Sequence, residues 1–96
     1  MKSKEQKRLE AALRILEGAR ISMEVANRLE LELALFNSMD PVKTWNQRFE
    51  IRENLTTKQA LIARAIKHAR DLDVNWKQVK AAWDRKWPVL SRWVIG

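Results

Sequence analysis

The sequence has no cysteine, one histidine, two glycines and two prolines among its 96 residues. Without cysteine it can form no disulfide, no thiolate zinc site and no thiol nucleophile. One histidine is too few for a histidine-based metal site or for a serine–histidine relay. Two glycines are too few for a glycine-rich phosphate loop or for a turn-dense sandwich or barrel. We therefore expect no metal, no cofactor and no enzymatic activity.

Long hydrophobic runs are also missing. No apolar stretch approaches the roughly 18–20 residues that a membrane-spanning helix needs, and no signal-peptide pattern follows Met1. We therefore expect no membrane partner and a cytoplasmic location. The chain length fits one domain, and a hydrophobic content of 46% with 32% charged residues is typical of a folded protein.

Apolar residues recur at the three- and four-residue spacing of an α-helix, so the sequence predicts helices. Over residues 3–17 four residues carry this pattern, namely Leu9, Ala12, Leu13 and Leu16. Gly18 interrupts that helix. Ser22 follows as a candidate N-cap, so we expect a second helix from there to residue 37.

Two capping signals predict the next two helices. The aspartate–proline pair at residues 40–41 places an acid at the cap and a proline at the first helical position, which opens a third helix ending near residue 54. Residues 56–59 form a capping box with Thr56 as its cap. A fourth helix is therefore expected over residues 57–72.

The last predicted helix begins at residue 76 and carries an aromatic and aliphatic stripe made of Trp76, Val79, Trp83, Trp87, Leu90 and Val94. Such a regular stripe indicates core positions, so we expect its three tryptophans to be buried. Pro88 lies within the stripe, and its ring should kink or break the helix near Trp87. The sequence therefore predicts an all-α fold of about five short helices that begins with an N-terminal helical hairpin.

Charge is distributed unevenly along the chain, whose net charge is +7. Residues 1–54 hold ten basic and nine acidic side chains, whereas residues 55–96 hold nine basic and three acidic ones. Clustered cations favour phosphate binding, because neutralising phosphates releases counterions. We expect residues 1–54 to supply packing and oligomerisation helices and residues 55–96 to supply a basic binding region.

The segment of residues 65–84 has a distinctive spacing. Its fifth position is Ala69, where two steeply crossing helices leave room for little more than a methyl group. Its eighth, tenth, fifteenth and eighteenth positions are apolar, namely Leu72, Val74, Val79 and Ala82. This spacing resembles the helix-turn-helix unit of the phage repressor and Cro type. Asp73 departs from that pattern, because the ninth position needs a left-handed backbone and usually holds glycine.

The resemblance implies that the fourth helix crosses the DNA backbone and that the segment beginning at residue 75 enters the major groove of duplex DNA. The side chains expected to contact base edges are Asn75, Lys77, Gln78 and Ala81. The cations expected to contact phosphates are Lys58, Arg64, Lys67, Arg70, Lys80 and Arg85. By analogy, the chain would be a regulator or accessory factor of a mobile element.

The same cations also suit a different class of function. A helical interaction module or inhibitor could dock them on the acidic surface of a larger protein, and RNA or single-stranded nucleic acid also stays open as a target. The leucine-rich segment of residues 29–35 offers more apolar surface than one short chain readily covers, so we expect a homodimer suited to a palindromic operator. The expected oligomer or partner contacts are Leu31, Leu35, Phe36 and Trp93.

Overall fold

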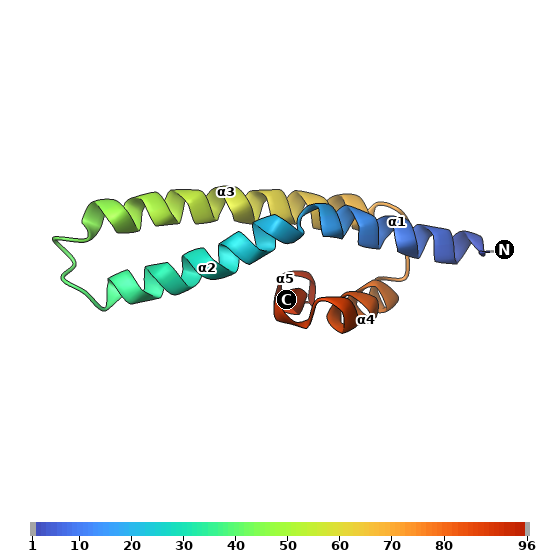
Figure 1. Cartoon of the computed structure of the whole chain (residues 1–96). Helices are drawn as coiled ribbons and strands as arrows, with labels where there is room; N and C mark the ends of the chain where they lie inside the picture. The colour runs from blue at the N-terminus through green and yellow to red at the C-terminus, as the bar shows by residue number, and fades with distance from the viewer. Residues whose placement is uncertain (1, 96) are drawn as a thin grey trace.

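The computed structural model describes residues 2–95, which form helices and no strand (Figure 1). The elements in chain order are α1 (Lys4–Gly18), α2 (Arg20–Asn37), α3 (Trp45–Arg70), α4 (Trp76–Lys86), the 3-10 turn η1 (Pro88–Leu90) and α5 (Ser91–Ile95). The expected all-α fold of about five helices is confirmed. The helices are not uniformly short, because α3 has 26 residues. None of the described helices is both long enough and apolar enough to cross a bilayer.

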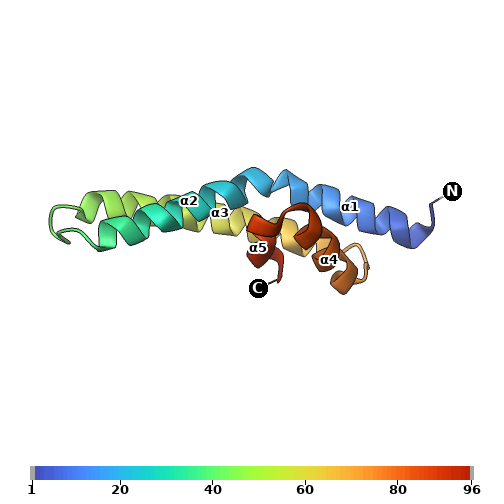
Figure 2. The same cartoon turned by 60° about the horizontal axis from the view of Figure 1, so that its bottom comes forward.

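The first two helices form one bent arm, and α3 returns antiparallel along both of them (Figures 1 and 2). The break between them is slight: the N–H of Ala19 bonds to the Leu16 carbonyl at 3.0 Å, and a new helix begins at the next residue. The expected hairpin within the first 37 residues is therefore wrong. The chain reverses at residues 38–44 instead, which produces a rod with extents of 60 × 21 × 17 Å.

The two arms meet along a seam whose positions recur at alternating spacings of four and three residues. On the first arm the fully or almost fully buried seam positions are Ala12, Leu16, Ala19, Met23 and Ala26. This spacing continues through the break between α1 and α2. A repeat of 3.5 residues keeps one face of a helix against its partner, as in a coiled coil. The alanines allow close approach, because the distance between helix axes depends on the side chains at the contact.

The same periodicity explains why α3 does not break where its sequence suggested. Its buried positions include Ile51, Leu55 and Ile62, which lie on both sides of the expected cap. The hydroxyl of Thr56 donates to the Arg52 carbonyl at 2.9 Å, so this residue bonds back along the helix instead of capping a new one. The predicted pair of helices on either side of residue 55 is therefore one helix.

Other helix boundaries agree only in part with the local signals. The second helix ends at Asn37 as expected, but it begins two residues before the expected cap Ser22. The Asp40 carboxylate does accept a hydrogen bond from the Val42 N–H at 2.9 Å, as a turn-forming aspartate should. The helix α3 nevertheless begins only at Trp45, after residues 41–44 have formed a turn.

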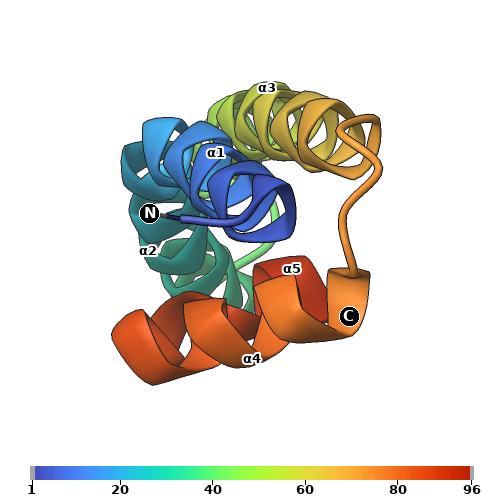
Figure 3. The same ribbon diagram turned by 90° about the vertical axis from the view of Figure 1, so that its right-hand side faces the viewer.

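The C-terminal residues form a small layer that packs on the first arm (Figure 3). The break at Pro88 is confirmed, since α4 ends at Lys86 and η1 begins at the proline. Trp83 is fully buried, and its indole N–H donates to the Leu90 carbonyl at 3.3 Å. Trp76 and Trp87 are half-buried against the same core. This layer covers α1 and the first part of α2. It does not reach the antiparallel pair formed by the end of α2 and the start of α3.

The continuity of α3 can be tested with two alanine variants. Thr56→Ala should raise the free energy of unfolding by about 0.5 kcal/mol, because alanine is the better residue inside a helix. If Thr56 were an N-cap, the same change would lower it by about 1 kcal/mol. Asn75→Ala is the matched control, because Asn75 does cap α4 and its loss should cost about 1 kcal/mol. Urea unfolding followed by circular dichroism measures both changes.

Candidate nucleic-acid interface

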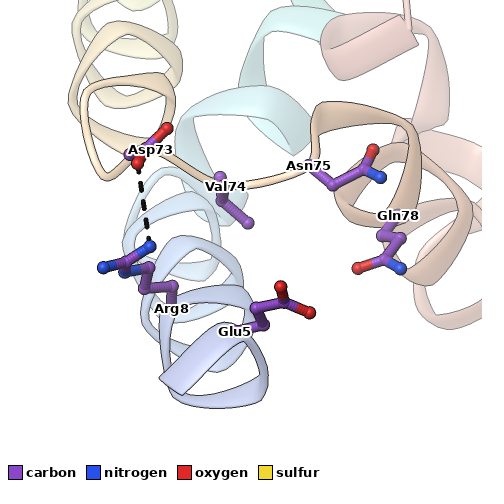
Figure 4. A pocket seen from close by; sticks show the side chains of 6 residues that line it. All are labelled: Glu5, Arg8, Asp73, Val74, Asn75 and Gln78. Carbon is purple, nitrogen blue, oxygen red and sulfur yellow. Dashed lines mark ion pairs between the residues drawn. The ribbon is translucent and has the colours of Figure 1, made fainter. Parts of the chain in front are cut away.

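The connection between α3 and α4 is a tight turn over residues 71–75. Asp73 has a φ of 53°, and no other non-glycine residue in the described chain has a positive φ. Its carboxylate lies 3.7 Å from the Arg8 guanidinium of α1 (Figure 4). This left-handed residue stands at the ninth position of residues 65–84, where the turn of a helix-turn-helix unit needs that conformation.

The apolar positions of residues 65–84 point into the core. Ala69 and Val79 are completely buried. Leu72, Val74 and Ala82 are half-buried, and the first two pack against the central apolar cluster. The segment is thus attached to the rod by its inner side, which leaves its outer side available.

The helix α4 runs across the long axis of the rod, so it does not lie parallel to α3 (Figure 3). It rests mainly on α1, on η1 and on α5, and its direct contacts with α3 are few. In this respect the arrangement departs from the compact pair implied by the resemblance, because α1, η1 and α5 support α4 more than α3 does. The two helices still join at one end of the rod through the short turn.

The exposed face of α4 is defined by the residues opposite its buried side. Val79 and Trp83 face the core and are fully buried. The exposed residues of this helix are Lys77, Gln78, Ala81, Asp84, Arg85 and Lys86. All four residues expected to contact bases are exposed, since Asn75 at the N-cap is also accessible.

Asn75 differs from the other three because its side chain already has a structural role. Its Oδ1 accepts a hydrogen bond from the Lys77 backbone N–H at 3.1 Å and so caps α4. Bidentate recognition of adenine needs both the oxygen and the amino group of an asparagine. Asn75 could make such a contact only by giving up its cap, so Lys77, Gln78 and Ala81 remain the better candidates.

A cleft opens beside the turn, between the start of α1 and the start of α4 (Figure 4). Its volume is about 270 Å³, and its lining is mostly polar, with Glu5 and Arg8 from α1 and Asn75 and Gln78 from the other side. Small-molecule pockets are usually apolar and larger, at about 300–1,000 Å³.

The cations expected to contact phosphates are not all brought together. Arg64, Lys67 and Arg70 are exposed on the last turns of α3, and the Arg70 guanidinium stacks 4.7 Å from the ring centroid of Trp76. Lys58 is half-buried and lies twelve residues before Arg70, which is about 18 Å along a helix. It is therefore remote from the turn.

On α4 itself the two expected phosphate contacts differ in exposure: Arg85 is exposed and Lys80 is half-buried. Other C-terminal cations are held by partners within the chain. Lys86 pairs with Glu17, and Arg92 pairs with Glu30 while also donating to the side chain of Asn27 at 2.8 Å. These two cations hold the C-terminal layer against the first arm.

The sequence analysis missed the cations of the N-terminus. Because α1 and α3 are antiparallel, the start of α1 lies at the same end of the rod as the turn (Figure 1). Five exposed cations from three helices gather there, and we call them the basic end: Lys4, Lys7, Lys67, Arg70 and Lys77. The lysines near the start of the sequence indicated a basic segment. Their position beside the turn could not be read from the sequence, because it depends on the antiparallel return of α3.

The expected oligomer contacts also divide into two groups. Leu31 and Leu35 are exposed on α2. Phe36 is half-buried against the core. Trp93 is half-buried as well, and its indole N–H donates to the Asn27 side chain at 2.9 Å. Of the four expected contacts, Leu31 and Leu35 are therefore accessible, whereas Phe36 and Trp93 are partly covered within the chain.

Comparison with protein-family models, with curated proteins and with solved structures gives no match for this chain. Within residues 2–95, no three acidic or histidine side chains lie close enough to hold a metal ion. The features of the chain that bear on function are the turn, the exposed face of α4 and the basic end.

The backbone at Asp73 gives a test of the turn that is independent of charge. Asp73→Gly and Asp73→Ala both remove the exposed pair with Arg8, so they differ only in backbone preference. Alanine should be about 1 kcal/mol less stable than glycine here, because a Cβ is disfavoured at positive φ. Equal urea midpoints for the two variants would contradict a left-handed residue at this position.

Proposed function

We propose that the chain binds duplex DNA, with the exposed face of α4 in the major groove. The main support is that Lys77 and Ala81 are exposed on a helix whose inner side is fixed by buried Val79 and Trp83, while Gln78 is exposed at the edge of the cleft beside α1. A helix attached in this way can enter a groove without exposing the core. The left-handed residue Asp73 before the helix adds a second, independent point of agreement with the helix-turn-helix unit.

Electrostatics supports the same proposal. The basic end supplies cations from α1 and from α3 near the start of α4. Neutralising several phosphates releases counterions, and this term supplies most of the non-specific affinity of DNA-binding proteins. Arg64 and Arg85 are further exposed candidates for phosphate contact. Three exposed acidic residues also lie near the turn, namely Glu5, Asp71 and Asp73, and a carboxylate at a DNA interface can accept a hydrogen bond from the cytosine amino group.

The role that follows by analogy is that of a small regulator or an accessory factor of a mobile element. The rival target is the acidic surface of a larger protein, which the same cations could contact. The two targets differ in what they require of Gln78. A base-reading glutamine contributes to sequence selectivity, whereas a protein target would be selected by charge and shape.

Fluorescence anisotropy with labelled duplexes can test the proposal. Duplexes selected from a random pool should bind more tightly than unselected ones, and log K should fall linearly with log salt at about −0.9 per neutralised phosphate. Lys77→Ala should weaken binding to all duplexes and reduce the slope by about one phosphate. Lys43→Ala is the matched control, because it removes one exposed cation from the opposite end of the rod.

Gln78→Ala should lower the preference for selected over unselected duplexes by about 1–3 kcal/mol while leaving the salt slope unchanged. Equal affinity for duplex, single strand and RNA, with equal effects of Lys77→Ala and Lys43→Ala, would contradict the groove-binding model. The absence of duplex binding at physiological salt would leave the acidic protein surface as the target to pursue.

A further inference from the structure

Three arginines of the described chain stack on tryptophan rings. In each pair the guanidinium carbon lies 4.3–4.7 Å from the centroid of the ring, and the pairs are Arg20 with Trp87, Arg70 with Trp76, and Arg92 with Trp93. The face of an indole ring attracts a cation, and the planar guanidinium of arginine stacks on it. Stacking occupies the face of the guanidinium and restricts the directions in which its N–H groups point.

Two of these arginines use their N–H groups within the chain. The guanidinium of Arg20 donates to the Glu24 carboxylate at 2.9 Å. The guanidinium of Arg92 donates to the Asn27 side chain at 2.8 Å and also pairs with Glu30. Both stacks therefore belong to contacts that hold parts of the protein together.

Arg70 is different from the other two. Its side chain is exposed, and among residues 2–95 it takes part in no ion pair and in no side-chain hydrogen bond. The nearby carboxylate of Asp73 lies beside Arg8 instead, at 3.7 Å. A guanidinium has only donors, arranged in a rigid fork that matches the paired oxygens of a carboxylate or a phosphate. Arg70 is thus oriented by a stack while its donors stay open to a ligand.

The stack also joins the two sides of the turn between α3 and α4 (Figure 4). Arg70 is the last residue of α3, and Trp76 is the first residue of α4. The indole is half-buried against the core, so the ring is the fixed member of the pair. The guanidinium is consequently held beside the start of α4, where Lys77 is the next exposed cation.

We propose that Trp76 is a positioning residue that holds Arg70 ready to bind one phosphate of the DNA backbone through paired N–H groups. This inference rests on the proposed binding of duplex DNA. Phosphate contacts fix the register of a protein on the duplex, although they do not read its sequence. The Arg70 contact would therefore fix how α4 is seated in the groove, whereas the lysines of the basic end contribute point charges.

The first test replaces arginine by lysine, which keeps the charge but loses the planar fork. Arg70→Lys should weaken binding to the selected duplexes about tenfold and leave the salt slope unchanged, because the same number of phosphates is neutralised. Arg20→Lys is the matched control, since Arg20 stacks at the same 4.7 Å but already has a partner within the chain. It should leave the affinity unchanged. Fluorescence anisotropy measures both variants, and circular dichroism confirms that both are folded.

The positioning role of Trp76 can be separated from a purely structural one by a double-mutant cycle. Trp76→Leu keeps an apolar side chain at the core and removes the indole face. It should weaken duplex binding about threefold when Arg70 is present and have almost no further effect when Arg70→Lys is present. A purely structural role would weaken binding equally in both backgrounds, so additive effects would overturn the positioning role.

The phosphate itself can be located on the duplex. Each backbone phosphate of a selected duplex is replaced in turn by an uncharged methylphosphonate, and the affinities of the unaltered protein and of Arg70→Lys are compared. One position should weaken binding by the unaltered protein about tenfold and have a clearly smaller effect on Arg70→Lys, because the paired contact is already lost. Equal losses for both proteins at every position would overturn the assignment of a phosphate to Arg70.

Failure of this inference is distinguishable from failure of the proposed function. If the unaltered protein binds duplex DNA and Arg70→Lys behaves like Arg20→Lys, the phosphate contact is overturned and DNA binding stands. If the unaltered protein binds no duplex, the proposed function is overturned and this inference falls with it.

Discussion

The 3.5-residue seam between the two arms is the constraint on which the rest of the structure depends. It continues from α1 into α2 through the break at Ala19, so a local interruption of hydrogen bonding does not change which face is buried. It also keeps α3 helical past Thr56, where a local signal favours a break. Burying the positions on both sides of residue 56 outweighs the small preference of one threonine for a cap, since a buried aliphatic side chain contributes about 1.5–3 kcal/mol.

The seam also determines where the charges lie. An antiparallel return brings the start of α1 beside the end of α3, and Arg8 consequently lies next to Asp73, 65 residues further along the chain. The helix α4 runs across the rod with Trp83 buried in the core, which leaves Lys77 exposed and Gln78 at the cleft beside α1. The candidate interface is therefore made by three helices, although the helix-turn-helix resemblance covers only two of them.

Local signals in the sequence predicted some helix boundaries correctly, whereas the candidate caps at Ser22, Asp40 and Thr56 did not begin the helices expected of them. Pro88 cannot continue a helix, so α4 ends before it. The end of α2 at Asn37 also agrees with the sequence prediction. The capping role of Asn75 was also available from the sequence, since asparagine is a preferred N-cap, but it was missed in favour of base contact. Periodicity correctly predicted the side of α4 that faces the core, since Val79 and Trp83 are fully buried.

What sequence reasoning could not supply was connectivity between distant segments. Nothing local distinguishes a first helix that folds back on the second from one that continues it, because both bury the same apolar stripe. The choice depends on α3, whose length makes it able to cover both helices at once. The error at Thr56 has the same cause. A capping box and two threonines inside a helix can have the same sequence, and only the packing of α3 against the first arm distinguishes them.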